Sequence, residues 1–201
     1  AADVVADAMN EIPKYCRLQR VQRDIPADFI EGGVWKSNLR QLAQQRADEK
    51  GYEIRDIRAR EVGHNDADPD PAEITLDTME YEAGGGTERF ISFEDPVRDL
   101  LIGFCRLRFP NDPARRELQD AALVRELHVY GSEATFDGTG DDSGAEWQHR
   151  GYGKRLVKEA ERQARAAGYG KLSIISGIGV REYYREKLGY HQDGPYVSKQ
   201  I

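Results

Sequence analysis

The pattern of apolar and polar residues predicts helices and strands in the first part of the chain. Apolar residues recur at helical spacing at the very start and again over residues 38–50, where Asn38 is the predicted N-cap and Gly51 follows the last turn. Residues 15–23 and 52–62 alternate in the manner of strands. This order predicts a small α/β fragment, which is too small to enclose a core of its own.

A longer and more regular pattern follows. Helices are predicted over 153–167 and 180–188, and strands over 74–82, 88–94, 99–108, 122–130, 172–176 and 190–197. Between the two parts, residues 64–71 combine short polar residues with two prolines, which is the composition of a linker. We therefore place a domain boundary after residue 70 and expect residues 71–201 to form one α+β domain.

Composition is typical of a soluble globular protein. Hydrophobic residues make up 39% and charged residues 32% of the 201 positions, and the mean hydropathy is -0.73. No run approaches the ~18 consecutive apolar residues of a membrane span, and the start of the chain carries acids where a signal peptide carries bases. We expect a cytoplasmic protein, trimmed at its start, with no membrane partner.

Charge is unevenly spread along the chain. The net formal charge is -7, but residues 1–60 sum to +1, residues 61–150 to -13 and residues 151–201 to +5. The two ends are able to face an anionic ligand, whereas the acidic middle is not.

A basic patch near the start has the spacing of a phosphate-binding surface. Its bases are Lys14, Arg17, Arg20 and Arg23, which fall three apart with no acid between them, and then Arg55, Arg58 and Arg60. Such a patch is able to hold RNA phosphates. The alternative is surface charge that nearby acids balance.

The most informative stretch is Gln-His-Arg-Gly-Tyr-Gly-Lys at 148–154, directly at the start of the longest predicted helix. Gly151 and Gly153 let the backbone approach a ligand closely, and the unpaired N–H groups of the first helical turn form an anion site together with the helix dipole. This arrangement suits a pyrophosphate. An ordinary helix start, with glycines for close packing, is the alternative.

The order of these motifs resembles the GNAT acetyltransferase core. Glu-Leu-His-Val at 126–129, the Gln-x-x-Gly-x-Gly turn, a long helix, a buried strand and Tyr-Tyr-x-x-x-Leu-Gly-Tyr at 183–190 follow one another as in that family. The resemblance implies the GNAT fold, which is α+β with a mixed, mostly antiparallel twisted sheet and flanking helices. It also implies acetyl-CoA binding, with the pyrophosphate on the glycine turn and the pantetheine arm between two splayed strands.

Further segments resemble the Elongator catalytic-subunit family. Arg-Glu-Leu-His-Val-Tyr-Gly at 125–131 and Ser-Gly-Ile-Gly-Val-Arg at 176–181 match its acetyltransferase half, and Val-Gln-Arg-Asp-Ile-Pro at 21–26 and Arg-Ala-Arg-Glu-Val-Gly at 58–63 match the end of its radical SAM domain. The resemblance covers nearly the whole chain. It implies that residues 1–70 are a fragment of the radical SAM domain with its junction and that 71–201 are the GNAT-type domain.

That family acts on tRNA. The resemblance implies an enzyme that builds a carboxymethyl group on C5 of the wobble uridine from acetyl-CoA and hydrolyses acetyl-CoA when tRNA is present. The radical half of the family uses S-adenosylmethionine and an iron–sulfur cluster on three closely spaced cysteines. This chain has only Cys16 and Cys105, far apart, so the cluster and the complete radical reaction are expected only in a longer protein. No metal site is expected in this chain.

The resemblance also gives roles to individual residues. The backbone of 126–129 is expected to line the acetyl and pantetheine site, and a tyrosine of the pair 183–184 to protonate the departing thiolate. The expected acetyl-CoA contacts are Glu126, Leu127, His128, Val129, Gln148, Arg150, Gly151, Tyr152, Gly153, Lys154, Tyr183 and Tyr184.

Several of these residues keep a second interpretation. Glu126 is a candidate general base for an amine acceptor, with a salt-bridge partner as the alternative. Strand alternation sends Glu126, His128 and Tyr130 to one face and Arg125, Leu127 and Val129 to the other. His128 is expected to be a hydrogen-bonded wall residue and not a metal ligand.

The two adjacent tyrosines have an alternative role as core aromatics. Neighbouring helical residues point ~100° apart, so only Tyr183 or Tyr184 is expected to face the sulfur of CoA. A neutral phenol suits protonation of a departing thiolate near neutral pH. Lys154 and Arg155 are candidates for the CoA phosphates, with solvated positions as the alternative.

Three functions compete. The first is the acetyl-CoA-binding acetyltransferase domain of a tRNA-modifying enzyme. The second is a free-standing GNAT enzyme that acetylates amines or protein lysines, and the third is a non-catalytic module that docks CoA and RNA. With a charge of -7, tRNA binding is expected to be weak or to depend on the missing domain. A homodimer or other Elongator-type subunits are the further expected partners.

Overall fold

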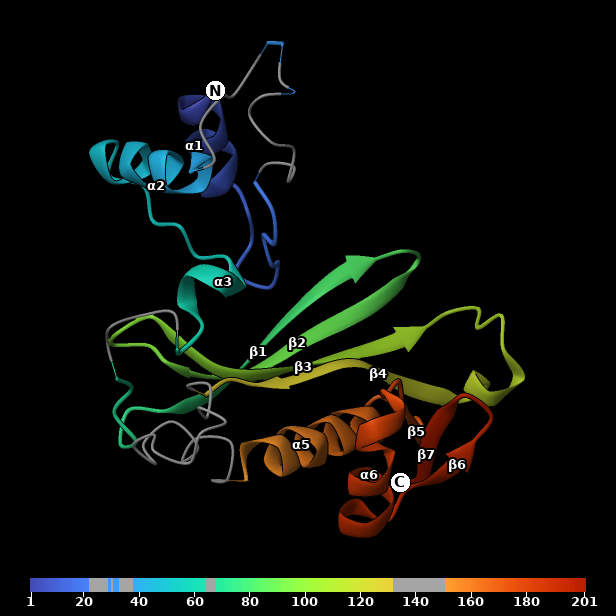
Figure 1. The fold of residues 1–201 in the computed structure, drawn as a ribbon. Helices are drawn as coiled ribbons and strands as arrows, with labels where there is room; N and C mark the ends of the chain where they lie inside the picture. Colours follow the sequence, from blue (N-terminus) through green and yellow to red (C-terminus); the bar gives the residue numbers. More distant parts are fainter. Residues whose placement is uncertain (22–28, 30, 33–37, 64–67, 132–150) are drawn as a thin grey trace. The chain divides into compact units, whose positions relative to one another are not determined.

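The computed structural model describes residues 1–21, 29, 31–32, 38–63, 68–131 and 151–201 (Figure 1). The chain divides into two compact units, Ala1–Asn65 and Asp66–Ile201. The predicted boundary after residue 70 and the assignment of the first segment to a radical SAM domain stay predictions.

The described part of the first unit is helical. It holds α1 (Ala2–Asn10), α2 (Leu39–Glu49) and the single turn α3 (Ile57–Arg60). α1 and α2 pack against each other through small buried residues such as Ala6 and Ala43. The two helices predicted at the start and over residues 38–50 are therefore present.

The two strands predicted for this unit are wrong over its described residues. Residues 15–21 and 52–63 contain no strand, so the predicted α/β fragment is helices and loops where it is described. One reason is Asp56, whose buried carboxylate accepts the backbone N–H of Leu18 (3.0 Å) and of Arg58 (3.2 Å). A side chain that takes these donors caps α3 and replaces a strand ladder.

The second unit is built on a seven-stranded sheet. Its strands are β1 (Thr75–Ala83), β2 (Gly86–Asp95), β3 (Leu100–Pro110), β4 (Ala121–Val129), β5 (Lys171–Ile174), β6 (His191–Asp193) and β7 (Tyr196–Gln200). The order across the sheet is β1-β2-β3-β4-β5-β7-β6, and only β4 and β5 pair in parallel. The mixed, mostly antiparallel sheet of the GNAT fold is thereby confirmed.

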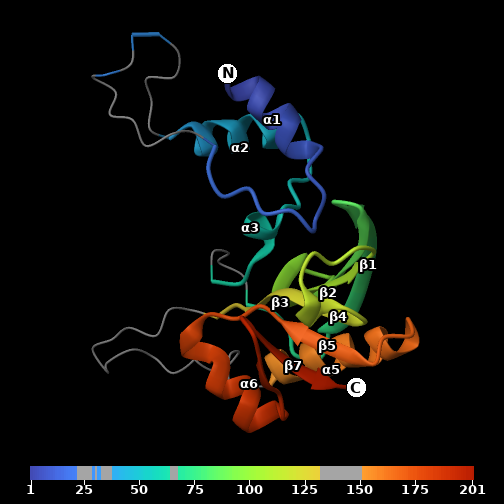
Figure 2. The same cartoon turned by 90° about the vertical axis from the view of Figure 1, so that its right-hand side faces the viewer.

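Two helices lie on one side of this sheet, α5 (Tyr152–Ala166) and α6 (Arg181–Leu188), as Figures 1 and 2 show. Two short 3-10 turns, Arg116–Leu118 and Ile178–Val180, lie in the connections. α5 packs against β2, β3 and β4. Its buried stripe includes Leu156, Val157 and Ala160, none of which is exposed, so the helix supplies one wall of the core.

The last predicted strand is two strands. Residues 190–197 form the end of the α6 connection and the hairpin of β6 and β7, which turns at Gly194. Gly194 has φ +58°, a left-handed conformation that glycine adopts without strain. The hairpin places β7 between β5 and β6 and not at the sheet edge.

Candidate functional site

β4 and β5 part halfway along β4. They pair from Ala121 with Lys171 to Val124 with Ile174, and one more backbone bond joins the N–H of Ile175 to the carbonyl of Val124 (2.9 Å). β4 continues to Val129, but no described residue of β5 pairs with it there. This side of β4 therefore has backbone groups to offer a ligand.

A β-bulge lies where the strands part. Across the ladder of β3 and β4, Arg106 pairs with Glu126 but the next residue, Leu107, pairs with Val124. Arg125 is the extra residue. Bulges bend a strand and re-aim its side chains, so this bulge gives a physical reason for the departure of β4 from β5.

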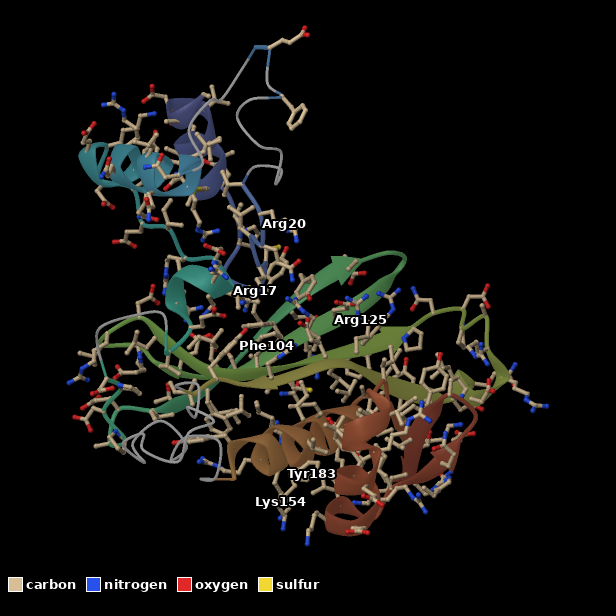
Figure 3. The ribbon with its side chains drawn as sticks, in the orientation of Figure 1. Arg17, Arg20, Phe104, Arg125, Lys154 and Tyr183 are labelled. Atoms are coloured by element: carbon tan, nitrogen blue, oxygen red, sulfur yellow. The ribbon has the colours of Figure 1, made fainter. Side chains whose placement is uncertain are left out.

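The face predicted for Arg125 is wrong because of this bulge. Its guanidinium lies 3.0 Å from the carboxylate of Glu88, on the face of the sheet that also carries the side chain of Glu126. The other faces are as alternation predicts: Glu126, His128 and Tyr130 on one side, Leu127 and Val129 on the side of α5. Figure 3 shows Arg125 and Phe104 in the region of the sheet.

Glu126 is held by two side chains, Arg106 and His128. The Nε atom of Arg106 donates to one carboxylate oxygen (2.6 Å), and Nε2 of His128 lies 3.1 Å from the other. The hydrogen bond from His128 and then the guanidinium of Arg106 lower the pKa of Glu126 to about 2, against the burial that raises it. A carboxylate with so low a pKa is a weak base, so the structure favours the salt-bridge interpretation of Glu126.

Arg106 and Glu126 belong to a larger polar network that includes the buried carboxylate of Glu88. Glu88, with 1% of its side chain exposed, accepts from the hydroxyl of Tyr81 (2.9 Å) and from Arg108 (3.0 Å), in addition to Arg125. Arg106 donates to the same Tyr81 hydroxyl (2.8 Å), which links Glu88 to the site. Burial is the main reason that the pKa of Tyr81 is raised to about 12, so its hydroxyl stays neutral.

α5 begins beside the end of β4. Its N-cap is Gly151, with φ +77° and no side chain to cap the first turn. Tyr152 is 5% exposed and packs edge-on against Phe93, which anchors that turn to β2. The first-turn N–H groups and the helix dipole are able to hold an anion at this end of α5, and the predicted pyrophosphate there stays a prediction.

Three elements meet at Gly153. A Cβ added there would lie 3.7 Å from Cγ2 of Val129 and 3.8 Å from the hydroxyl of Tyr183. The first turn of α5, the unpaired end of β4 and the start of α6 are therefore neighbours. Figure 3 shows Tyr183 and Lys154 on the side of the sheet that carries α5 and α6.

The two tyrosines have different surroundings. Tyr183 is 41% exposed, with its hydroxyl beside Gly153, and partial burial raises its pKa. Tyr184 is 6% exposed and packs against the rings of Tyr183 and Tyr190, and burial raises its pKa to about 12. Only Tyr183 has its hydroxyl at the meeting point of the three elements, and Tyr184 fits the core-aromatic alternative.

The two bases after the glycine turn differ as well. Lys154 is exposed, whereas the guanidinium of Arg155 lies over the ring of Phe93 at 4.3 Å and over that of Tyr152 at 5.2 Å. Arg155 therefore helps to anchor α5, and Lys154 keeps its predicted access to a phosphate. Gln148 and Arg150 lie outside the described residues.

The basic patch of the first unit is partly used in other contacts. Arg17 forms an ion pair with Glu61, and Arg60 is 2% exposed. Arg17 fits the balanced-charge alternative, Arg60 is buried away from a surface ligand, and Arg23 lies outside the described residues.

Sequence reasoning missed Arg106 as the partner of Glu126 and Tyr81 as the partner of Arg106. These two residues lie 20 and 45 positions before Glu126, so no local motif joins them. A signal was present in β3, where Arg106 and Arg108 alternate with buried apolar residues in an otherwise apolar strand. Partly buried charges on a strand require partners.

The described residues contain neither a membrane-spanning helix nor a cluster of metal-binding side chains. None of the helices in those ranges is long and apolar enough to cross a membrane. Within the same ranges, no three or more histidine, cysteine or acidic side chains are grouped to hold a metal ion.

Known proteins with similar sequences agree with the GNAT resemblance. The model of the acetyltransferase (GNAT) family matches residues 51–190. The tRNA uridine(34) acetyltransferase of Methanocaldococcus infernus is 49% identical over 207 residues, which cover 100% of this chain and 38% of that protein. Elongator complex protein 3 of Drosophila melanogaster is 46% identical over 206 residues, which cover 99% and 36%.

A solved structure agrees in fold over the full chain. The archaeal Elp3 of Methanocaldococcus infernus, with an N-terminal deletion, is 49% identical with a TM-score of 0.92, and the match covers 100% of this chain and 48% of that one. The chain thus spans little more than a third of the length of the curated relatives it matches.

Proposed function

Because this chain belongs to the GNAT acetyltransferase family, we propose that it binds acetyl-CoA where α5, β4 and α6 meet and catalyses cleavage of the thioester. The observation that carries this proposal is the placement of Gly153 beside Val129 and the hydroxyl of Tyr183. Acetyl-CoA requires an anion site for its pyrophosphate, open strand backbone for its pantetheine amides and an acid for its sulfur. The first turn of α5, the side of β4 that β5 leaves open and the phenol of Tyr183 supply these at one place.

Each part of acetyl-CoA has a matching group. The pyrophosphate accepts from the first-turn N–H groups of α5, with Lys154 available to a phosphate. The two amides of the pantetheine arm pair with the backbone of β4 beyond Val124, where β5 is absent. Tyr183 is a neutral phenol, and partial burial raises its pKa further, so it is able to donate its proton to the departing thiolate.

We propose that the acceptor chemistry is that of tRNA uridine modification. The relatives named tRNA uridine(34) acetyltransferase and Elongator complex protein 3 match this chain throughout. By resemblance, the complete reaction on C5 of the wobble uridine needs the radical SAM half, for which this chain lacks the cysteines. The role left to this chain is acetyl-CoA binding and its hydrolysis in the presence of tRNA, in the cytoplasm, with a second copy or other subunits as partners.

A free-standing amine acetyltransferase that uses Glu126 as its base has less support. That function calls for a base that deprotonates an ammonium group. Glu126, the sequence candidate for this task, has a pKa of about 2 and is occupied by Arg106 and His128.

Calorimetric titration of desulfo-CoA, a non-hydrolysable analogue, tests the binding site. Gly151→Glu places a side chain and a negative charge at the proposed pyrophosphate position, so we expect the affinity to fall at least ~100-fold. Gly168→Glu is the matched control, because Gly168 also has a positive φ (+92°), also has nothing within 4 Å of an added Cβ, and lies beyond the other end of α5. Equal affinity of the two variants would contradict the site.

Thiol release from acetyl-CoA with and without tRNA then separates a tRNA-dependent enzyme from a binding module.

A further inference from the structure

We propose that His128 is a catalytic residue of this site, the general base that takes a proton from the water that attacks the acetyl carbonyl. This inference rests on the proposed function, since it concerns the same thioester. His128 is a different residue from the candidates Glu126 of β4 and Tyr183 of α6.

His128 lies on the stretch of β4 that β5 leaves unpaired. Val129, its neighbour, faces α5 and the tyrosine hydroxyl, so the side chain of His128 points to the opposite face of the sheet. A pantetheine arm that starts at the N-terminus of α5 and passes between β4 and β5 delivers its thioester toward that face. His128 therefore stands on the far side of the carbonyl from Tyr183, and acid and base flank the thioester.

Glu126 fixes the orientation of the imidazole. Nε2 of His128 lies 3.1 Å from Oε1 of Glu126, and Arg106 fixes the other carboxylate oxygen at 2.6 Å. A carboxylate that accepts from Nε2 keeps the proton on that nitrogen and leaves Nδ1 as the proton acceptor. Nδ1 has no partner among the residues that the structure describes.

The imidazole of His128 is held by ring contacts and is open to water. The side chain of His128 is 51% exposed, and its ring packs on Phe104 at 5.3 Å and stacks with Tyr130 at 6.2 Å. The charged groups on this face include Glu126 and Arg125 on the same strand, Arg106 and Arg108 from β3, and Glu88 from β2. The carboxylate of Glu126 also lies where it stabilises the positive charge that the imidazole gains when it takes a proton.

The step balances in atoms and charge. The water oxygen forms a bond to the acetyl carbon while Nδ1 of His128 takes one of its protons. The C–S bond then breaks, and the thiolate takes the proton of the Tyr183 hydroxyl. His128 releases its proton to solvent and Tyr183 regains one from solvent. The products are CoA thiol and acetate, with one proton released from the acid.

Thiol release from acetyl-CoA, measured from pH 5 to 9 with and without an unmodified tRNA transcript, tests this role. In His128→Gln we expect turnover to fall ~100-fold or more, with the rise of rate with pH lost. Desulfo-CoA affinity is expected to stay within ~2-fold, because the backbone of β4 is unchanged. His191→Gln is the matched control, since His191 is an exposed histidine on β6, and it is expected to behave as the unaltered chain.

Two further variants separate catalysis from structure. His128→Ala with added imidazole is expected to recover part of the lost turnover, which a merely structural residue would not allow. Glu126→Gln keeps an oxygen for Nε2 but removes the carboxylate charge that stabilises the protonated imidazole, so turnover is expected to fall while desulfo-CoA affinity is kept.

The outcomes distinguish this inference from the proposed function. Turnover by the unaltered chain that persists in His128→Gln, with the same pH profile, would overturn the role of His128 alone. Desulfo-CoA binding without any thiol release from the unaltered chain would overturn both. Loss of desulfo-CoA affinity in His128→Gln to the same extent as turnover would assign the residue to binding and overturn its catalytic role.

Discussion

The hydroxyl groups of two adjacent tyrosines have opposite surroundings. Tyr183 reaches the glycine turn, whereas Tyr184 is buried in the core. We expect Tyr183→Phe to lower thioester turnover ~10-fold or more, with little change in melting temperature, because only the proton donor is removed. Tyr184→Phe is its matched partner and is expected to retain turnover. Steady-state thiol release and thermal melting of both variants check this, and a reversed pattern would place Tyr184 at the sulfur.

The low pKa of Glu126 makes stability depend on pH. Its folded pKa of about 2 lies below its ordinary value of 4.5, so its contribution is fully present above pH 4.5 and is lost as pH falls from 4.5 through 2. Since about a third of the side chain is exposed, we expect this contribution to be only ~1 kcal/mol. Urea unfolding between pH 5 and 2.5 measures it. Glu126→Gln should lose ~1 kcal/mol less than the unaltered chain over that range, and parallel curves would refute the contribution.

At the scale of elements, the bulge in β4 decides the shape of the site. Removal of Arg125 leaves Val124 and Glu126 paired with Leu107 and Arg106 in a regular ladder and keeps every other side chain on its face. We therefore expect the deletion to yield a folded protein in which β4 is straighter and follows β5 further. Affinity for desulfo-CoA should fall ~10-fold or more.

Arg125→Ala is the control for this deletion. It removes the guanidinium and its contact with Glu88 but keeps the extra residue. Calorimetric titration and circular dichroism of the two variants check the prediction. Similar affinities in the deletion and the substitution would mean that the bulge itself does not shape the site.

At the scale of the whole molecule, charge is separated along the chain. The two ends carry +1 and +5, and the middle carries -13. We expect tRNA to bind through few phosphate contacts, so affinity should fall ~10-fold or more when KCl rises from ~50 to ~200 mM. Fluorescence anisotropy of a labelled tRNA measures this. Desulfo-CoA, held mainly by backbone groups, serves as the control ligand and should change less, and a flat response for tRNA would contradict electrostatic binding.

The sequence by itself determined the elements of the second unit and the glycine turn. Periods of two and of 3.6 residues mark β1 to β5, α5 and α6, because local alternation reports which face of a strand or helix is buried. The position of Gly151 at a helix start and the resemblance to the GNAT family also needed no coordinates. Each of these features depends on residues that are close together in the sequence.

Only the tertiary structure decided the details on which the chemistry depends. The face of Arg125 depends on how β3 pairs with β4, and the separation of Tyr183 from Tyr184 depends on where α6 meets α5. The weak basicity of Glu126 comes from Arg106, a residue on another strand. The split of the last strand and the helical turn α3 follow from a left-handed glycine and a capping aspartate. These outcomes rest on contacts between distant residues, which local periodicity does not encode.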